Sequence, residues 1–262
     1  MNKHTFVVLA YKESEYLEEC IKSVTNQKSK SNVVIATSTP NSFINKLAKK
    51  YKLDVIVNKE HRNIGGDFDF AVQAGNTELV TVAHQDDLYD EEYSESVINR
   101  YEKNKNSIIL FTDYYEIKEN QKIYHNRLLK IKRILLIPLR ISIWSSRRFI
   151  KRLSLRFGCP ICCPSVTFVK DKINFPLFEN EFKANVDWNA WEKLSKEKGA
   201  FSYIRKPLMG HRVHEASTTT SIIKENTRTK EDQAMFERFW PKCIARLLNK
   251  YYVKAEESNK VS

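Results

Sequence analysis

Two adjacent carboxylates are the clearest chemical feature of this sequence. Asp86 and Asp87 follow an apolar run, 79–83, that has the composition of a buried strand. Neighbouring carboxylates repel one another, and a divalent cation would relieve that repulsion, since Mn²⁺ and Mg²⁺ accept hard oxygen ligands. An acidic turn that caps the following helix is the alternative. The position of the pair at the end of a predicted strand favours the metal.

Polar segments follow each strand predicted in the first half of the chain. The apolar runs that predict these strands are 5–10, 32–36, 54–57 and 79–83. Segments with helical spacing lie between them, so the order predicts an α/β protein with a mostly parallel sheet and helices on both faces. Ligands of such sheets bind beyond the carboxyl ends of the strands. The segments predicted to form a site are therefore 11–13, 37–40, 61–67 and 84–87.

The second half of the chain has a less regular pattern. Further strands are predicted at 107–112, with 114–118 continuing antiparallel, and at 165–169 and 201–205. A helix is predicted at about 186–196, and a last helix is expected to break near Pro241. Residues 254–262 are charged and are expected to fray.

Composition limits the class of protein. The 262 residues are 42% hydrophobic, which suffices for a sizeable core, and only six are glycine. The odd number of cysteines, five, and the lack of a secretory leader predict an intracellular protein. The chain has no apolar run of about 20 residues, so it is not expected to span a membrane. Cys159, Cys162 and Cys163 lack a second ligand pair for zinc, so small buried thiols are expected there.

The net charge of +12 implies an anionic partner. Residues 122–170 contain no acidic side chain, and within them 127–156 mixes Leu and Ile with Lys, Arg and Trp, as in segments that lie on anionic lipid. Pro138 would divide this segment into two helices. A nucleic-acid surface is one alternative, although phosphate contacts require far fewer apolar residues. A buried helical hairpin with a basic solvent face is the other.

Segments 6–17 and 84–87 resemble family-2 glycosyltransferases, which have the Rossmann-like GT-A fold. Those proteins open with such a strand, loop and helix and carry a DXD-type motif, of which 84–87 looks like a variant. The resemblance implies that Asp87 ligates the metal and that Asp86 contacts the donor ribose or the metal. His84 stands where many members have the first Asp of the motif. The resemblance covers about 5–220 and thins in the middle.

The resemblance also implies the remaining donor contacts. They are Ala10, Tyr11, Glu13, Thr37, Ser38, Asn63, Gly65, Asp67, Gln85, Asp86 and Arg212. Where the family often has an Asp that holds the base, this chain has Thr37 and Ser38, whose hydroxyls can hydrogen-bond uracil. His214 is the implied third metal ligand, and Arg212 would stabilise charge. A structural role for His211 or His214 is the alternative.

The second catalytic candidate is Asp187. By the resemblance it matches the carboxylate that, at the start of an acceptor-side helix, takes the proton of the attacking hydroxyl, although Val186 replaces an acidic residue common before it. The alternative is that Asp187 only caps its helix. The QxxRW motif of processive members is absent, which implies transfer of a single sugar.

The resemblance thus implies an inverting enzyme that uses Mn²⁺ or Mg²⁺. It would transfer one sugar from a nucleotide diphosphate-sugar, with UDP expected, to a glycan or polyprenyl-diphosphate-linked acceptor in surface polysaccharide synthesis. The expected place is the cytoplasmic face of the cell membrane, on its anionic surface. No nucleic acid partner is expected, and a homo-oligomer is left open. The alternative is an inactive protein that binds nucleotide sugars or serves as a membrane scaffold.

The same interpretation divides the chain into segments with different tasks. Residues 1–120 would form the nucleotide-sugar-binding core, and 121–158 a basic amphipathic insertion. Residues 159–225 would form the acceptor side of the catalytic domain, and 226–262 a C-terminal helix and tail.

Overall fold

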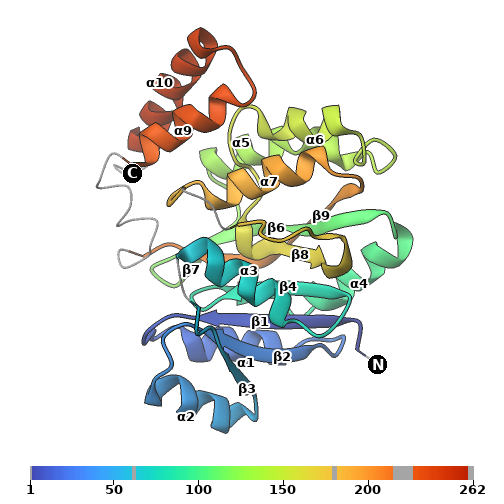
Figure 1. Ribbon diagram of the computed structural model, residues 1–262, viewed down its shortest axis with the longest axis vertical. Coiled ribbons are helices and arrows are strands. Elements are labelled where there is room, and N and C mark those ends of the chain that lie inside the picture. Colours follow the sequence, from blue (N-terminus) through green and yellow to red (C-terminus); the bar gives the residue numbers. More distant parts are fainter. Residues whose placement is uncertain (1, 61–62, 179–181, 215–226, 259–262) are drawn as a thin grey trace.

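A mixed sheet with helices on both faces forms the centre of the protein (Figure 1). The computed structural model describes residues 2–60, 63–178, 182–214 and 227–258, with side chains as far as Tyr252. Its strands are β1 (His4–Ala10), β2 (Asn32–Thr37), β3 (Asp54–Val57), β4 (Leu79–His84), β5 (Leu88–Tyr89), β6 (Ser107–Lys118), β7 (Gln121–Ile123), β8 (Val166–Val169) and β9 (Ala200–Arg212). Its longer helices are α1 (Leu17–Thr25), α2 (Ser42–Tyr51), α3 (Ile64–Ala74), α4 (Tyr93–Lys103), α5 (Arg127–Leu135), α6 (Arg148–Leu155), α7 (Val186–Lys196), α9 (Thr227–Glu237) and α10 (Lys242–Ser258).

The first four strands confirm the predicted parallel sheet. They lie in the order β3-β2-β1-β4, and each pair is parallel. Short helices cross between them, as their apolar spacing predicts, and Asn41 caps α2 by accepting from the backbone N–H of Ile44. The carboxyl ends of these strands therefore share one edge of the sheet.

Beyond β4 the sheet is mixed, which the sequence pattern did not predict. β8 lies antiparallel between β4 and β6, β9 runs parallel to β6, and β5 and β7 pair antiparallel at the periphery. Thr81 of β4 is opposite Thr167 of β8, so the chain enters β8 at the edge where β4 ends. The segment just before β8, with its cysteines, is thereby brought to the ligand edge. The segment lies at this edge because β8 runs antiparallel to β4, and hydrophobic periodicity does not predict the direction of a strand.

The predicted bounds of β6 and β9 were too short. Residues 107–112 were expected as one strand and 114–118 as an antiparallel return, yet β6 is a single strand that continues through register shifts beside Asp113. β9 likewise continues beyond 201–205 to Arg212. The extension matters because the end of β9 reaches the predicted metal site.

Two hydrophobic cores cover the two faces of the sheet. One contains residues of α3, α6, α7 and α9, with Trp188 and Trp191 of α7 fully buried. The other contains residues of α1, α2 and α4. The predicted bounds of α7 are confirmed, and Pro241 does separate α9 from α10. Residues 259–262 of the expected tail lie outside the described part of the chain.

The basic segment is partly packed and partly exposed. α5 is followed by the 3-10 helix η1 (Ile137–Arg140), which contains Pro138, and then by α6. Leu129, Leu136, Leu139 and Leu155 are buried, as a packed hairpin predicts. Other large apolar side chains are exposed: Ile131, Ile134, Ile137, Ile141, Ile143, Trp144 and Phe149. Among the described residues, no helix has both the length and the apolar composition needed to cross a membrane.

Candidate active site

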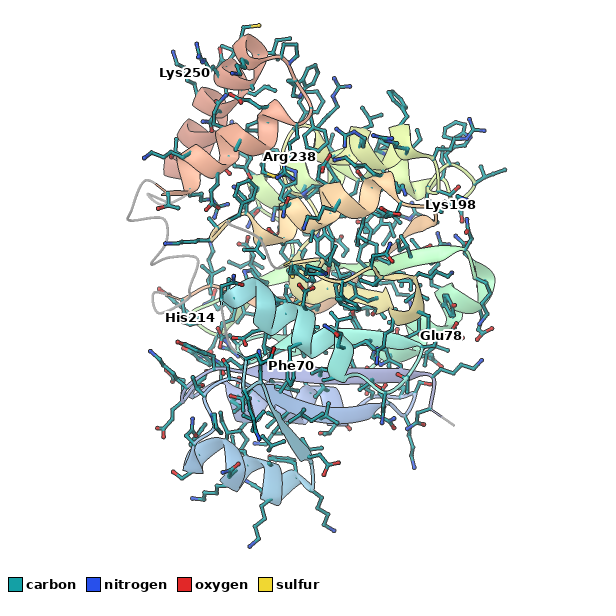
Figure 2. All side chains as sticks on the ribbon, in the orientation of Figure 1. Phe70, Glu78, Lys198, His214, Arg238 and Lys250 are labelled. Carbon is teal, nitrogen blue, oxygen red and sulfur yellow. The ribbon has the colours of Figure 1, made fainter. Side chains whose placement is uncertain are left out.

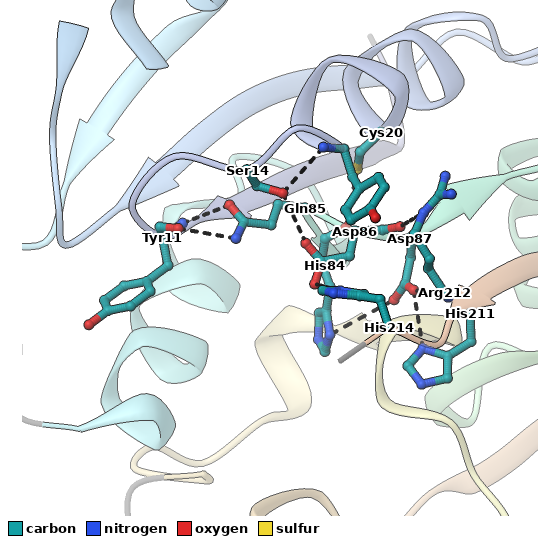
Figure 3. Close-up of polar contacts among 11 residues, drawn as sticks. Tyr11, Ser14, Cys20, His84, Gln85, Asp86, Asp87, His211, Arg212 and His214 are labelled. Atoms are coloured by element: carbon teal, nitrogen blue, oxygen red, sulfur yellow. Dashed lines mark hydrogen bonds and ion pairs between the residues drawn. The ribbon is translucent and has the colours of Figure 1, made fainter. Parts of the chain in front are cut away.

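The ends of β1 and β4 are joined by one glutamine side chain (Figure 3). The Gln85 amide oxygen accepts from the backbone N–H of Tyr11 at 2.9 Å, and its amide nitrogen donates to the Tyr11 carbonyl at 3.1 Å. Ala10 is buried just before this link, whereas the ring of Tyr11 is 44% exposed and Glu13 faces solvent. Gln85 therefore fixes the loop after β1.

Asp86 lies between the loop after β1 and the end of β9. One carboxylate oxygen accepts from the Ser14 hydroxyl at 3.3 Å, and the other is 3.1 Å from Nε2 of His214. The His214 ring also packs against the Tyr16 ring, with 5.1 Å between centroids. The structure thus brings His214 to the predicted metal site, but its contact there is with Asp86.

Asp87 is buried, and its contacts come from β9. Oδ1 accepts from the backbone N–H of Arg212 at 2.9 Å and is 3.1 Å from Nδ1 of His211. Oδ2 is buried without a hydrogen-bond partner among the described residues, and so is Nε2 of His84, whose Nδ1 lies 4.0 Å from Oδ2. An orphaned carboxylate oxygen beside an imidazole is an arrangement that a cation could complete.

Charges around Asp87 keep it ionised. Burial opposes its negative charge, but His211 outweighs that effect, and the pKa of Asp87 lies below its ordinary value. Burial likewise opposes protonation of His211, yet the Asp87 carboxylate raises the pKa of His211. Burial lowers the pKa of His84, which favours the neutral imidazole that a metal requires.

Neither aspartate caps the next helix. α4 begins at Tyr93 with Glu92 at its N-cap, and β5 lies between the aspartates and that helix. The interpretation of Asp86 and Asp87 as an acidic helix cap is therefore wrong.

Arg212 is buried in a network that holds the site together. Its guanidinium donates to the backbone carbonyl of Asp86 at 3.0 Å, to Glu19 at 2.6 Å and to Asn120 at 3.2 Å. It also lies over the ring of Tyr16, 4.3 Å from the centroid. Each guanidinium nitrogen already has a partner, so the geometry shows Arg212 bracing the loop of Asp86.

The loop after β2 has its own internal bonds. Thr37 is fully buried, and its hydroxyl accepts from the Thr39 N–H at 3.0 Å, while the Thr39 hydroxyl accepts from Lys12 N–H at 2.6 Å. The Ser38 hydroxyl donates to Asp67 at 2.9 Å. Thr37 therefore shapes the loop, and Ser38 ties it to α3.

The start of α3 carries the remaining residues predicted to contact the donor. Asn63 caps the helix by accepting from the backbone N–H of Gly66 at 2.8 Å, and Gly65 is buried in the first turn. Asp67 accepts from Asn58 at 2.8 Å as well as from Ser38. Residues 61 and 62 of the predicted loop lie outside the described residues. Asp67 is thus the link between two of the predicted nucleotide loops.

Asp187 lies in the first turn of α7, on the other side of the thiol segment. Its carboxylate accepts from the adjacent Trp188 N–H at 2.7 Å and is 3.6 Å from the Cys159 thiol. The N-cap residue of α7 is Asn185, and Asp187 lies two positions further on. Burial raises the pKa of Asp187, and its negative charge acts on His84, which places it near the Asp86–Asp87 pair.

A carboxylate of α9 holds the turn that precedes Asp187. Glu231 accepts from the backbone N–H groups of Lys183 at 2.8 Å, Ala184 at 2.8 Å and Asn185 at 2.9 Å. Asp232 accepts from the Asn185 side chain at 2.8 Å. α9 is also tied to α7 through Arg238, which lies between the C-terminal helices and the layer of α7 (Figure 2). The C-terminal helices therefore support the start of α7.

The cysteines lie beside a lysine of α5. Lys132 donates to the Tyr114 hydroxyl at 2.9 Å, and although burial opposes its charge, this contact raises the pKa of Lys132. Burial raises the pKa of Cys159, Cys162 and Cys163, so these are neutral thiols. Across the described residues, no group of three or more His, Cys, Asp and Glu could hold a metal ion by itself.

Sequence reasoning missed residues that only the fold brings together. The spacing relates His211 only to His214, yet His211 is the imidazole that contacts Asp87. Lys132 lies in the segment predicted to face a membrane, but it contacts Tyr114. Nothing in the pattern around Glu231 indicates its contact with the turn before α7. The only available signal for His211 was its spacing from His214 after a predicted strand.

Known proteins share this architecture. The sequence profile described as glycosyl transferase family 2 matches residues 5–175. No curated protein matched the sequence. S. aureus TarS (residues 1–349) in complex with UDP-GlcNAc is 14% identical with a TM-score of 0.60, over 96% of this chain and 71% of that one.

Two further solved structures show the same fold. Mannosyltransferase PcManGT from Pyrobaculum calidifontis, in complex with GDP-Man and Mn²⁺, is 12% identical with a TM-score of 0.62, over 95% of this chain and 69% of that one. Glucosyl-3-phosphoglycerate synthase from Mycobacterium tuberculosis, solved with Mn²⁺, UDP-Glc and phosphoglyceric acid, is 12% identical with a TM-score of 0.58, over 90% and 78%. The chain therefore has the GT-A fold and belongs to glycosyl transferase family 2.

Proposed function

We propose that this chain transfers a single sugar from a nucleotide diphosphate-sugar to an acceptor hydroxyl, with inversion at the anomeric carbon. The observation that carries the proposal is the buried Oδ2 of Asp87, which has no hydrogen-bond partner among the described residues and lies at the sheet edge where β1, β4 and β9 end. Asp87 and Asp187 both act electrostatically on His84, so the two carboxylates lie on the same side of the sheet edge. One carboxylate is suited to hold a cation, and the other to take a proton. The two roles are separated between β4 and α7.

The donor set at the sheet edge fits a divalent cation. Asp87 is ionised and has a free oxygen, His84 is neutral, and Asp86 lies alongside with His214. Mixed carboxylate and imidazole ligands suit Mn²⁺ better than Mg²⁺, which prefers oxygen. When bound, such an ion would stabilise the negative charge that develops on the leaving diphosphate. Because the described side chains form no closed cage by themselves, the donor's phosphate oxygens would supply the remaining ligands.

Asp187 is proposed as the general base. It would accept the proton of the acceptor hydroxyl while the oxygen attacks the anomeric carbon and the bond to the diphosphate breaks. Burial raises its pKa and so makes it a stronger base than an exposed carboxylate. The Trp188 N–H fixes the carboxylate, and the neighbouring Cys159 thiol is neutral, so it does not repel the ionised form.

The donor loops and the basic segment supply the finer proposals. Ser38 and Asp67 border the place expected for the base, with Tyr11, Glu13 and Asn63 beside it, and UDP is the proposed nucleotide. Among the similar structures, TarS was solved with UDP-GlcNAc and PcManGT with GDP-Man. Exposed apolar side chains in 131–149 among basic residues support attachment to an anionic membrane surface. A glycan or polyprenyl-diphosphate-linked acceptor of surface polysaccharide synthesis, met at the inner face of the cell membrane, fits that placement.

Thermal denaturation with a panel of UDP- and GDP-sugars, with and without Mn²⁺, tests the donor site. A donor whose free concentration is 100 times its Kd stabilises the folded state by about 2.7 kcal/mol. We expect one donor to stabilise the protein only with Mn²⁺, and Asp87→Asn to abolish that effect. Asp90→Asn, the same change on an exposed side chain nearby, is the matched control. Equal stabilisation of both variants would contradict the metal role of Asp87.

Product formation separates an enzyme from a scaffold. The stabilising donor is incubated with a glycan primer or a polyprenyl-diphosphate-sugar, and the new linkage is identified by NMR of its anomeric proton. An inverted linkage supports the proposal. Binding without either transfer or metal-dependent donor hydrolysis would instead identify an inactive nucleotide-sugar-binding protein.

A further inference from the structure

A second, cationic cavity lies outside the candidate active site. Its volume is about 350 Å³, and its walls come from β6, β9, η1, α5 and the segment before α5. The lining residues that matter here are Asp113, His125, Arg133, Arg140, Tyr203 and Arg205. None of the residues placed at the candidate active site lines it.

The cavity carries more positive than negative charge. Arg133 is already engaged, because its Nε donates to Asp113 at 2.7 Å and its Nη1 donates to the Tyr124 carbonyl. Arg140 and Arg205 have no carboxylate partner within the described part of the chain. The pair of Arg133 and Asp113 therefore cancels, and two guanidinium groups remain for an anionic ligand.

The guanidinium groups of the cavity lie around the Tyr203 side chain. Its side chain is 5% exposed and stacks on Phe111, with 5.1 Å between ring centroids. Burial and Asp113 raise the pKa of Tyr203, while Arg140, Arg133 and Arg205 each oppose that rise. All three guanidinium groups thus act on one phenol. Its hydroxyl has no hydrogen-bond partner among the described residues and is available to donate to a ligand.

A phosphate group matches this wall. Guanidinium groups bind phosphate oxygens through paired N–H donors, and a neutral phenol adds another donor. The cavity also opens beside apolar side chains, because Ile137 and Arg140 are three residues apart in η1, where such positions share a face. Ile134 is 61% exposed, Ile137 47% and Ile141 44%. Inorganic phosphate gains nothing from these apolar side chains, whereas a lipid phosphate carries acyl chains that can contact them.

We propose that this cavity binds the phosphate headgroup of an anionic membrane lipid, while Ile134, Ile137 and Ile141 contact the acyl chains. The inference rests on the membrane attachment proposed above and gives it a defined headgroup site. It is independent of the metal and of Asp187, so donor hydrolysis and headgroup binding can fail separately.

Vesicle sedimentation with the full chain tests the site. The vesicles contain phosphatidylcholine with or without phosphatidic acid. The variant Arg140→Lys with Arg205→Lys keeps the charge but removes the planar fork, so a headgroup site predicts about tenfold weaker binding to phosphatidic acid. The matched control is Arg147→Lys with Arg148→Lys, on exposed side chains of the same basic segment, and it should bind as the unmodified chain does. Equal binding by both variants would overturn the site, because general attraction between surface charges does not distinguish Lys from Arg.

Two further arms identify the source of the phosphate. Ile137→Ser with Ile141→Ser should weaken vesicle binding but leave binding of inorganic phosphate, measured by calorimetry, unchanged. If the Arg→Lys pair lost inorganic phosphate binding and kept vesicle binding, the cavity would serve a soluble phosphate, and the lipid assignment would be wrong. Donor hydrolysis and melting temperature are measured in every variant, and both should match the unmodified chain.

Discussion

The clamp from α9 to the start of α7 gives the most specific prediction. Glu231→Gln keeps the size of the side chain but replaces one carboxylate oxygen with an amide NH₂. One oxygen of Glu231 accepts from Lys183, and the other accepts from Ala184 and Asn185. In its better orientation, the glutamine keeps the two contacts of one oxygen and places a donor against the Lys183 N–H.

The size of the effect follows from that lost contact. A backbone N–H left without an acceptor costs about 1–3 kcal/mol. For a chain of this size about 1 kcal/mol corresponds to about 2–4 °C in melting temperature, so we expect a decrease of about 2–12 °C. A misplacement of about 1 Å at a catalytic group can cost about 100-fold in rate. Since the turn held by Glu231 leads directly into Asp187, we expect kcat to fall about 10- to 100-fold.

Steady-state kinetics with the donor identified above distinguish positioning from simple stability. The proposed donor site lies at the ends of β1, β2, β4 and β9 and at the start of α3, whereas Glu231 hydrogen-bonds to the turn before α7. The KM for the donor should therefore stay within about twofold while kcat falls. Glu237→Gln, on an exposed side chain of the same helix, is the control and should change neither. If Glu231→Gln lowered the melting temperature but left kcat unchanged well below that temperature, the positioning argument would be refuted.

Four further predictions concern Asp187 and the lysine of α6 that binds carbonyl groups at and after the end of α7. Asp187→Asn should lower kcat by about 10²- to 10⁴-fold without weakening donor binding in calorimetry, whereas Cys159→Ala, which removes a neighbouring thiol, should retain most activity. The pKa of Asp187 is raised by burial, so kcat should fall as pH falls through that raised value, and a pH–rate profile of the Asn variant should lack this limb. Because the pKa of Asp187 is higher in the folded than in the unfolded state, the folded state loses stability as pH rises from the unfolded-state pKa to the folded-state pKa. At neutral pH the Asp187→Asn variant should therefore melt at a higher temperature than the unmodified chain. Lys151→Met removes a buried ammonium that donates to the carbonyls of Leu194, Glu197 and Gly199. In urea denaturation this variant should lower the free energy of unfolding by about 3 kcal/mol and leave donor binding unchanged. An unchanged denaturation midpoint would contradict this prediction.

Local patterns determined the first half of the chain. The apolar runs before Tyr11, Thr37 and Asn58 alternate with helical repeats, and each element forms where the pattern predicts it. Parallel pairing then follows, because strands joined by crossing helices must run in the same direction. The gathering of Gln85, Asp86 and the loop after β1 at one edge was therefore predictable from the sequence.

The second half depends on contacts between residues far apart in the chain. β8 runs antiparallel to β4, and this direction brings Cys159 to the ligand edge beside Asp187. The register shifts of β6 let β9 reach Asp87 with His211, an imidazole that the sequence did not single out.

The sequence by itself determined the family, the parallel half of the sheet and the acidic pair at its edge, because these depend on residue type and short-range periodicity. Only the tertiary structure decided which imidazole contacts Asp87, which glutamate supports the turn before Asp187, and which basic side chains line a cavity. Periodicity states which face of an element is buried, but not which distant element packs against it. Hydrogen bonds such as those of Glu231, 46 to 48 residues from its partners, exist only once the chain has folded.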